Sequence, residues 1–173
     1  MTVEGRVLVV DDDPQILRAV RTTLQAHGHE VLSAGNGETA LDVLVDDEVD
    51  LIVLDLGLPG IEGHEVIRRV RAWSEVPIIV LSVRESQRDK VEAFEAGADD
   101  YVTKPFGMPE LLARMRAVRR RATADRRPPV LRFGDLDVDL GRQLVQIQSD
   151  IVHLTPTEYR LLEAFVTNPG KLL

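Results

Sequence analysis

Residues 51–55 read LIVLD, a continuous apolar run that ends in a single acid. A short run of this kind, with no polar alternation, is typical of a strand that is buried on both faces of a parallel sheet. Two similar runs, VLVV at 7–10 and IIVL at 78–81, occur before and after it. Apolar residues at helical spacing follow the first run, at Ile16, Leu17, Val20 and Leu24. The pattern predicts strands that alternate with helices.

Two shorter apolar pairs, at 31–32 and 101–102, complete a set of five expected strands. Each of the four strands after the first is followed by apolar residues at helical spacing. We expect these residues to form the inward faces of helices near 40–44, 66–70, 91–94 and 111–118. Five strand–helix repeats with short connections predict an α/β fold, a doubly wound five-stranded parallel sheet. We expect this domain to occupy residues 1–121.

The residues that end the expected strands are unusually polar. They are Asp11, Asp12 and Asp13 after the first strand, Asp55 at the third, Ser82 at the fourth, and Thr103 and Lys104 at the fifth. Ligands of doubly wound sheets bind at the carboxyl ends of the strands, so these side chains should share one edge. A single acid there is as often a solvated loop residue or a helix cap. Four polar strand ends together favour a site.

The chemistry of such a site follows from its charges. Crowded carboxylates repel one another unless a cation joins them, and oxygen ligands without His or Cys suit Mg²⁺, or Mn²⁺. With the ion bound, one carboxylate could act as nucleophile toward a phosphoryl group, while Lys104 and Ser82 hold the phosphoryl oxygens. The strand ends therefore predict a divalent-cation site for phosphoryl transfer.

Composition narrows the class of protein. The 173 residues include no cysteine, which excludes disulfides, thiolate metal sites and a cysteine nucleophile. Residues 1–6 lack a signal pattern, and no apolar run reaches the roughly 18 residues that span a bilayer, so we expect a cytoplasmic protein with no membrane partner. The net charge of −8 argues against a dedicated nucleic-acid binder, although residues 114–127 contain seven arginines and one acid.

A second, smaller domain is expected after this basic stretch. Residues 122–129 end in Arg-Arg-Pro-Pro and indicate a linker. Beyond it, apolar alternation over 131–138 and 144–147 predicts short antiparallel strands. Thr155, Pro156 and Glu158 form the pattern of a helix start, with a capping threonine, a proline in the first turn and a capping-box acid.

Four segments carry a resemblance to a known family. VLVVDDDPQ at 7–15, LIVLDLGLPGIEG at 51–63, PIIVLS at 77–82 and AGADDYVTKPF at 96–106 resemble the signature segments of response-regulator receivers. The resemblance covers residues 5–121 and implies a CheY-like, flavodoxin-like fold.

The same resemblance implies roles for individual residues. Asp55 would be both the phosphoacceptor and a Mg²⁺ ligand. Asp12 would be a direct Mg²⁺ ligand, Asp11 a ligand through water, and the carbonyl of Gly57 a further ligand. Lys104 would pair with the phosphoryl group and Ser82 would swing toward it. Tyr101 would then rotate inward. The alternative interpretations are that Tyr101 is a core aromatic and Ser82 a strand-end hydroxyl. Val83 departs from the family, which usually has a smaller residue there, and this puts access to Asp55 in doubt.

The segment HLTPTEYRLLEAFVTNPGKLL at 153–173 resembles the start of the OmpR and PhoB winged-helix effector domain. Residues 130–173 would then be the N-terminal part of a truncated DNA-binding domain, before its recognition helix. This subfamily implies a sensor histidine kinase, promoter DNA for the full-length protein, and a homodimer through the fourth helix, fifth strand and fifth helix. Candidate interface pairs are Lys90 with Glu110 and Asp100 with Arg114, although solvated helix charges explain each pair equally well.

Within the subfamily, LDLGLPG, RAWSEVPIIVLS and FGDLDVDL together with HLTPTEYRLL most resemble a regulator of a potassium-uptake operon. Two other functions remain open. One is a stand-alone interaction switch that never touches DNA. The other is an Mg²⁺-dependent phosphohydrolase that forms an aspartyl phosphate, but Gly57 stands where such hydrolases of the haloacid-dehalogenase type need a second Asp. We therefore expect no enzyme activity beyond phosphorylation and dephosphorylation of Asp55 itself.

Overall fold

The computed structural model describes residues 4–125, 130–140, 143–148 and 150–167. The chain divides into two compact units, Met1–Ala122 and Thr123–Leu173. Each unit is described by itself.

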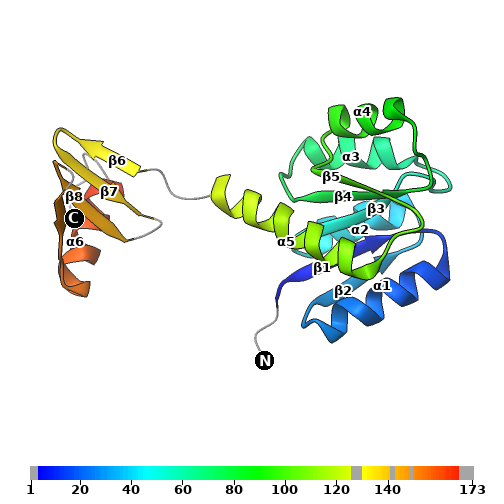
Figure 1. The fold of residues 1–173 in the computed structure, drawn as a ribbon, viewed down its shortest axis with the longest axis horizontal. Helices are drawn as coiled ribbons and strands as arrows, with labels where there is room; N and C mark the ends of the chain where they lie inside the picture. The colour runs from blue at the N-terminus through cyan, green and yellow to red at the C-terminus, as the bar shows by residue number, and fades with distance from the viewer. Residues whose placement is uncertain (1–3, 126–129, 141–142, 149, 168–173) are drawn as a thin grey trace. The chain divides into compact units, whose positions relative to one another are not determined.

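The first unit alternates strands and helices five times (Figure 1). Its elements are β1 Arg6–Val10, α1 Pro14–Ala26, β2 Glu30–Ala34, α2 Gly37–Asp46, β3 Leu51–Asp55, α3 Gly63–Arg71, β4 Ile78–Ser82, α4 Gln87–Ala96, β5 Asp100–Thr103 and α5 Met108–Asp125. The last three residues of α5 belong to the second unit. The strands pair in the order β2-β1-β3-β4-β5, and all four pairings are parallel. The doubly wound parallel sheet predicted from the sequence is confirmed.

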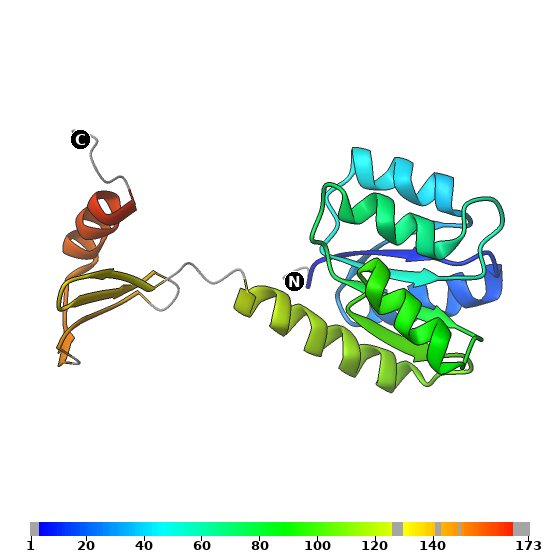
Figure 2. The ribbon, with the colours of Figure 1, turned by 90° about the horizontal axis from the view of Figure 1, so that it is seen from above.

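The sheet is covered on both faces, which explains why its central strands are continuously apolar. Figure 2 shows α2 and α3 on one side of the sheet and α1 and α5 on the other. Every residue of β3 and β4 is buried. On one face Ile52 and Leu54 belong to the cluster that includes α2, α3 and α4, while Val53 packs on the other face with α1 and α5. Full burial of such a side chain contributes about 1.5–3 kcal/mol.

Side-chain caps set where several helices begin. Asp13 accepts a hydrogen bond from the backbone N–H of Gln15 at the start of α1, and Asn36 accepts one from Thr39 at the start of α2. Each cap satisfies an N–H group that the first helical turn leaves without a partner. Because both caps follow strand ends, they also fix the loops at the edge where the polar residues gather.

Helix α5 is longer than expected. It continues through residues 122–125, which we had assigned to the linker, and ends at Asp125. These residues contain neither Gly nor Pro, so nothing in them stops a helix that is already formed. The remainder of the expected linker, 126–129, lies outside the described residues.

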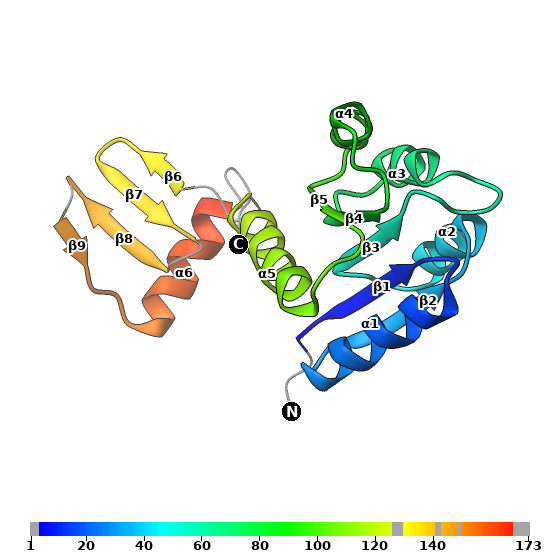
Figure 3. The same cartoon turned by 45° about the vertical axis from the view of Figure 1, so that its right-hand side comes forward.

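The second unit is a four-stranded antiparallel sheet with one helix (Figure 3). Its elements are β6 Val130–Phe133, β7 Leu136–Asp139, β8 Leu144–Ile147, β9 Asp150–Val152 and α6 Pro156–Thr167. Val138, Val145 and Tyr159 form its buried core, so α6 covers one face of the sheet. The predicted helix start is confirmed, because Thr155 and Glu158 exchange hydrogen bonds as a capping box.

Among the described residues, no helix combines the length and the apolar character needed to cross a membrane.

Candidate functional site

The polar strand ends meet at one edge of the parallel sheet. Asp55 is the last residue of β3 and stands in register with Leu81 of β4. Ser82, the last residue of β4, stands in register with Thr103 of β5, and Lys104 follows directly. Asp11 follows β1 and bonds through its N–H to Ala34 O at the end of β2. The parallel pairing thus brings together residues that are up to 93 positions apart in the sequence.

Three carboxylates converge at this edge. Asp11, Asp12 and Asp55 each offer one oxygen such that these atoms all lie within 4.8 Å of one another. Asp11 and Asp55 are buried, at 1% and 7% exposure, whereas Asp12 is exposed. An all-oxygen group of this kind is suited to a hard divalent cation, and an exposed member leaves a route for the ion to enter. The residues therefore fit a divalent-metal site.

Lys104 supplies the positive charge that faces these acids. Its Nζ lies 2.7 Å from Asp11 Oδ2 and 3.3 Å from Asp55 Oδ2. Burial raises the pKa of Asp11, and the hydrogen bond from Lys104 opposes part of that rise. Burial alone would lower the pKa of Lys104, but the hydrogen bond to Asp11 and the charge of Asp55 outweigh it and raise the pKa. Lys104 is thus held as a cation beside both buried acids.

Gly57, in the loop after β3, contacts Asp55 through its backbone. The N–H of Gly57 donates a hydrogen bond to Asp55 Oδ1 at 3.2 Å. A methyl group at Gly57 would lie 3.6 Å from the nearest Asp55 oxygen, which is ordinary contact distance. Gly57 therefore orients the Asp55 carboxylate through its N–H, while its carbonyl as a metal ligand stays a prediction.

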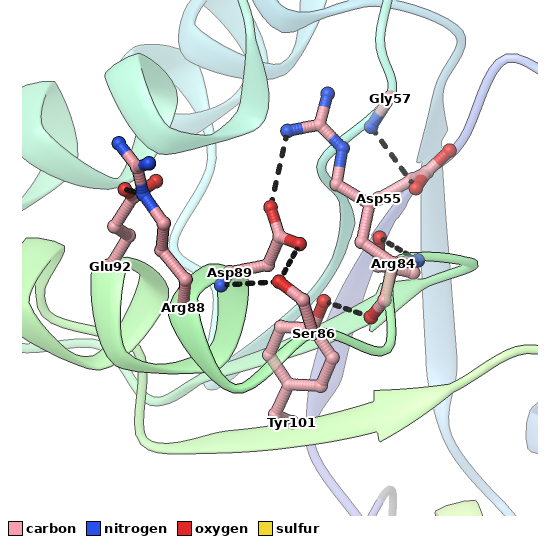
Figure 4. Close-up of polar contacts among 9 residues, drawn as sticks. Asp55, Gly57, Arg84, Ser86, Arg88, Asp89, Glu92 and Tyr101 are labelled. Carbon is pink, nitrogen blue, oxygen red and sulfur yellow. Dashed lines mark hydrogen bonds and ion pairs between the residues drawn. The ribbon is translucent and has the colours of Figure 1, made fainter.

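Ser82 and Tyr101 both bond to the backbone of Arg84, and Figure 4 shows the bond from Tyr101. Ser82 is 1% exposed, and its Oγ accepts a hydrogen bond from the N–H of Arg84 at 3.1 Å. Tyr101 is 7% exposed, and its hydroxyl donates to the carbonyl of Arg84 at 2.7 Å. Tyr101 therefore already points inward in this structure, and its rotation on phosphorylation stays a prediction.

The charged residues of the expected dimer interface have partners within one chain. Arg114 lies 3.1 Å from Asp100 and 3.1 Å from Glu110 of the same chain, so the Asp100–Arg114 pair closes within one molecule. The hydrogen bond to Asp100 is the main cause of a raised pKa of Arg114. The Nζ of Lys90 lies 5.8 Å from the centre of the Tyr101 ring. An intermolecular role for these residues would require them to exchange partners.

Val83, which departs from the family pattern, is 73% exposed. It lines an apolar hollow of about 460 Å³ next to Lys104, together with Ile16, Phe106 and Met108. The effect of Val83 on access to Asp55 stays a prediction.

Sequence reasoning missed Arg84 and Asp89. The Nη1 of Arg84 lies 3.8 Å from Asp89 Oδ1, and Asp89 also bonds to Ser86, the N-cap of α4. The sequence does indicate the contact between Ser86 and Asp89, because these two residues have the spacing of a capping box. Nothing in the sequence pattern links Arg84 to either of them.

The comparisons with known proteins agree with this site. Residues 7–116 match the response regulator receiver domain family, and the chain belongs to that family. It is 48% identical over 169 residues to the transcriptional regulatory protein KdpE of Mycobacterium tuberculosis, covering 96% of this chain and 75% of the relative. It is 46% identical over 168 residues to the KDP operon transcriptional regulatory protein KdpE of Escherichia coli K12, with the same coverage. The receiver domain of the Francisella response regulator 1452 superimposes with a TM-score of 0.66 at 32% identity, covering 69% of this chain and 99% of that domain.

Proposed function

We propose that this chain is a two-component response regulator that controls transcription by accepting a phosphoryl group on Asp55. The observation that carries the proposal is the position of Asp55, a buried carboxylate at the end of β3 with Asp11, Asp12 and Lys104 around it. Asp55 is the acid of this group that ends a central strand, and its Oδ2 lies 3.3 Å from Lys104 Nζ.

In the proposed reaction, an oxygen of Asp55 attacks phosphorus and the bond from phosphorus to the donor breaks. The donor is a phosphohistidine of a sensor kinase or a small acyl phosphate, and its leaving group departs with the electron pair. A bound divalent ion, Mg²⁺ or Mn²⁺, supplies charge neutralisation for the incoming group. Asp12 would hold that ion directly, Asp11 through water, and Gly57 through its carbonyl.

The residues of the chain itself would hold the transferred group. Lys104 would move a short way from Asp11 to a phosphoryl oxygen, since its Nζ already lies within reach of both acids. The hydroxyl of Ser82 would donate to a second oxygen. Because Ser82 Oγ accepts a hydrogen bond from Arg84 N–H, a movement of Ser82 would disturb Arg84, whose carbonyl binds the Tyr101 hydroxyl.

The output of the switch is proposed from the relatives and from the second unit. Both KdpE relatives are named as transcriptional regulators, and one as a regulator of the KDP operon. By analogy, the partners are a sensor histidine kinase, promoter DNA of a potassium-transport operon, and a second copy through α4, β5 and α5. The small antiparallel sheet with α6 would be part of the DNA-binding effector domain.

Phosphoryl uptake tests the proposal. Wild type and Asp55→Asn would be incubated with acetyl phosphate, with Mg²⁺ or with EDTA, and followed by intact-protein mass spectrometry and size-exclusion chromatography. We expect one phosphoryl group on wild type with Mg²⁺ only, and a shift toward dimer. Equal uptake by Asp55→Asn, or none by wild type, would remove Asp55 from the mechanism.

A further inference from the structure

Arg84 stands between three parts of the first unit. Its N–H donates to Ser82 Oγ. Its carbonyl accepts the hydroxyl of Tyr101, and its guanidinium lies 3.8 Å from Asp89 (Figure 4). The first two contacts use the backbone, so a residue of any type at position 84 has the groups to make them. The third uses the side chain alone, which makes it the contact that a substitution can remove cleanly.

Asp89 connects Arg84 to the first turn of α4. Its N–H donates to Ser86 Oγ at 3.1 Å, and its carboxylate accepts the hydroxyl of Ser86 in return. These two bonds join the N-cap side chain of α4 to Asp89 and fix the carboxylate in place. Asp89 is 25% exposed at its side chain, and Arg84 is 42% exposed. The guanidinium is therefore held by an acid that is itself anchored to the helix.

This anchoring bears on Tyr101. The residues 83–86 connect β4 to α4 and are exposed, so little packing fixes the orientation of the Arg84 peptide group. The inward position of Tyr101 depends on that peptide group, because its carbonyl is the acceptor of the tyrosine hydroxyl. A buried hydroxyl without an acceptor is costly, so a displaced carbonyl would favour an outward ring.

We propose that Arg84 is a positioning residue whose ion pair with Asp89 holds its carbonyl in place for Tyr101, and so keeps the tyrosine inward. The inference rests on the proposed function for its meaning, since Tyr101 is the residue expected to carry the signal from Asp55. It adds a specific role to the Arg84 side chain, which the proposed reaction at Asp55 does not use. The two helix-start residues, Ser86 and Asp89, thereby become part of the switch.

The pair is partly exposed, so its effect should be modest. An exposed or half-exposed ion pair shifts a local equilibrium by about two- to fivefold. We expect Arg84→Gln, which leaves the Ser86–Asp89 hydrogen bonds intact, to lower the ratio of inward to outward Tyr101 by about that factor. Arg84→Lys keeps a cation within reach of Asp89 and should retain most of the wild-type ratio.

The chain offers a matched control on the same helix. Arg88 lies 2.8 Å from Glu92 in an exposed pair within α4, drawn beside the Arg84–Asp89 pair in Figure 4. Arg88→Gln removes an ion pair of the same type from α4 without touching the carbonyl of Arg84. It should leave the Tyr101 ratio at the wild-type value.

The measurement is NMR of ring-labelled tyrosine in the full chain, without phosphodonor, with Tyr159→Phe used to assign the Tyr101 signal. A shift toward the exposed-ring position in Arg84→Gln, absent in Arg88→Gln and mostly rescued in Arg84→Lys, supports the inference. An Arg84→Gln spectrum equal to wild type, or an equal shift in Arg88→Gln, overturns it. Acetyl phosphate uptake by wild type, measured separately, tells failure of this inference from failure of the proposed function.

Discussion

Replacement of Lys104 by Met tests the electrostatics of the site. The change keeps most of the apolar stem but removes the ammonium group that lies 2.7 Å from Asp11 and 3.3 Å from Asp55. Removal of one partner from a buried ion pair costs about 3–5 kcal/mol, because a buried charge is left uncompensated. Asp11 can respond by taking up a proton, since burial raises its pKa, so we expect a loss near the lower end, about 3 kcal/mol.

Urea unfolding at pH 7 in EDTA measures this loss. The chain has a single tryptophan, Trp73, so its fluorescence reports on the first unit alone. Lys90→Met is the matched control, because Lys90 contacts the Tyr101 ring and should cost about 1 kcal/mol or less.

Mg²⁺ adds a second signature to this experiment. A divalent ion replaces the lost positive charge, so it should stabilise Lys104→Met more than it stabilises wild type. A Lys104→Met loss no larger than that of Lys90→Met, or equal Mg²⁺ stabilisation of wild type and Lys104→Met, would refute the idea that Lys104 compensates the buried acids.

Three further changes test other parts of the account. Ser82→Ala should still allow phosphoryl uptake at the phosphoacceptor but weaken the response of the tyrosine ring by NMR, and an undiminished response would contradict a role for the hydroxyl. Gly63→Ala would place a methyl group 2.6 Å from backbone atoms of Asp55 and Leu56, so we expect its free energy of unfolding, measured in urea, to fall by at least about 1 kcal/mol. Gly35→Ala places its methyl group in open space and should leave the free energy of unfolding unchanged. Thr155→Ala removes the cap of α6 and should speed amide exchange in that helix by a factor that corresponds to about 1 kcal/mol; unchanged exchange would show that the capping box contributes nothing.

The central strands of the fold could be predicted because a continuous apolar run indicates a strand that is buried on both faces. Residues 51–55 and 78–82 are apolar at nearly every position, and the structure buries all of them. The ends of helices were harder, because a helix that lacks a stop signal continues as far as its neighbours allow. For this reason α5 extends to Asp125, beyond the expected end at residue 121. Strand β9 was also missed, since its three residues are too short for a periodic pattern.

The members of the site could be predicted, but their partners could not. The positions of Asp11, Asp55 and Lys104 at strand ends predicted that they lie close together, because parallel strands end at the same edge of a sheet. The closer approach of Lys104 to Asp11 than to Asp55 depends on ångström differences between three strands. The backbone of Arg84 gives no sign in the sequence of the two hydrogen bonds it makes.

Residues of the expected dimer interface also have partners within one chain. Arg114 was expected to face Asp100 of a second copy, yet α5 and β5 bring the two together within one chain. A charged pair that is complementary between copies is also complementary within a copy when both elements lie side by side.

The central claim is that Asp55, and not one of its acidic neighbours, takes the phosphoryl group. Wild-type protein would be treated with acetyl phosphate and Mg²⁺, the aspartyl phosphate trapped by borohydride reduction, and the modified position located by peptide mass spectrometry. The account predicts modification at Asp55 alone, with Asp11, Asp12 and Asp13 unmodified in the same sample. Modification at any of these three acids, or the absence of a modified aspartate, would contradict it.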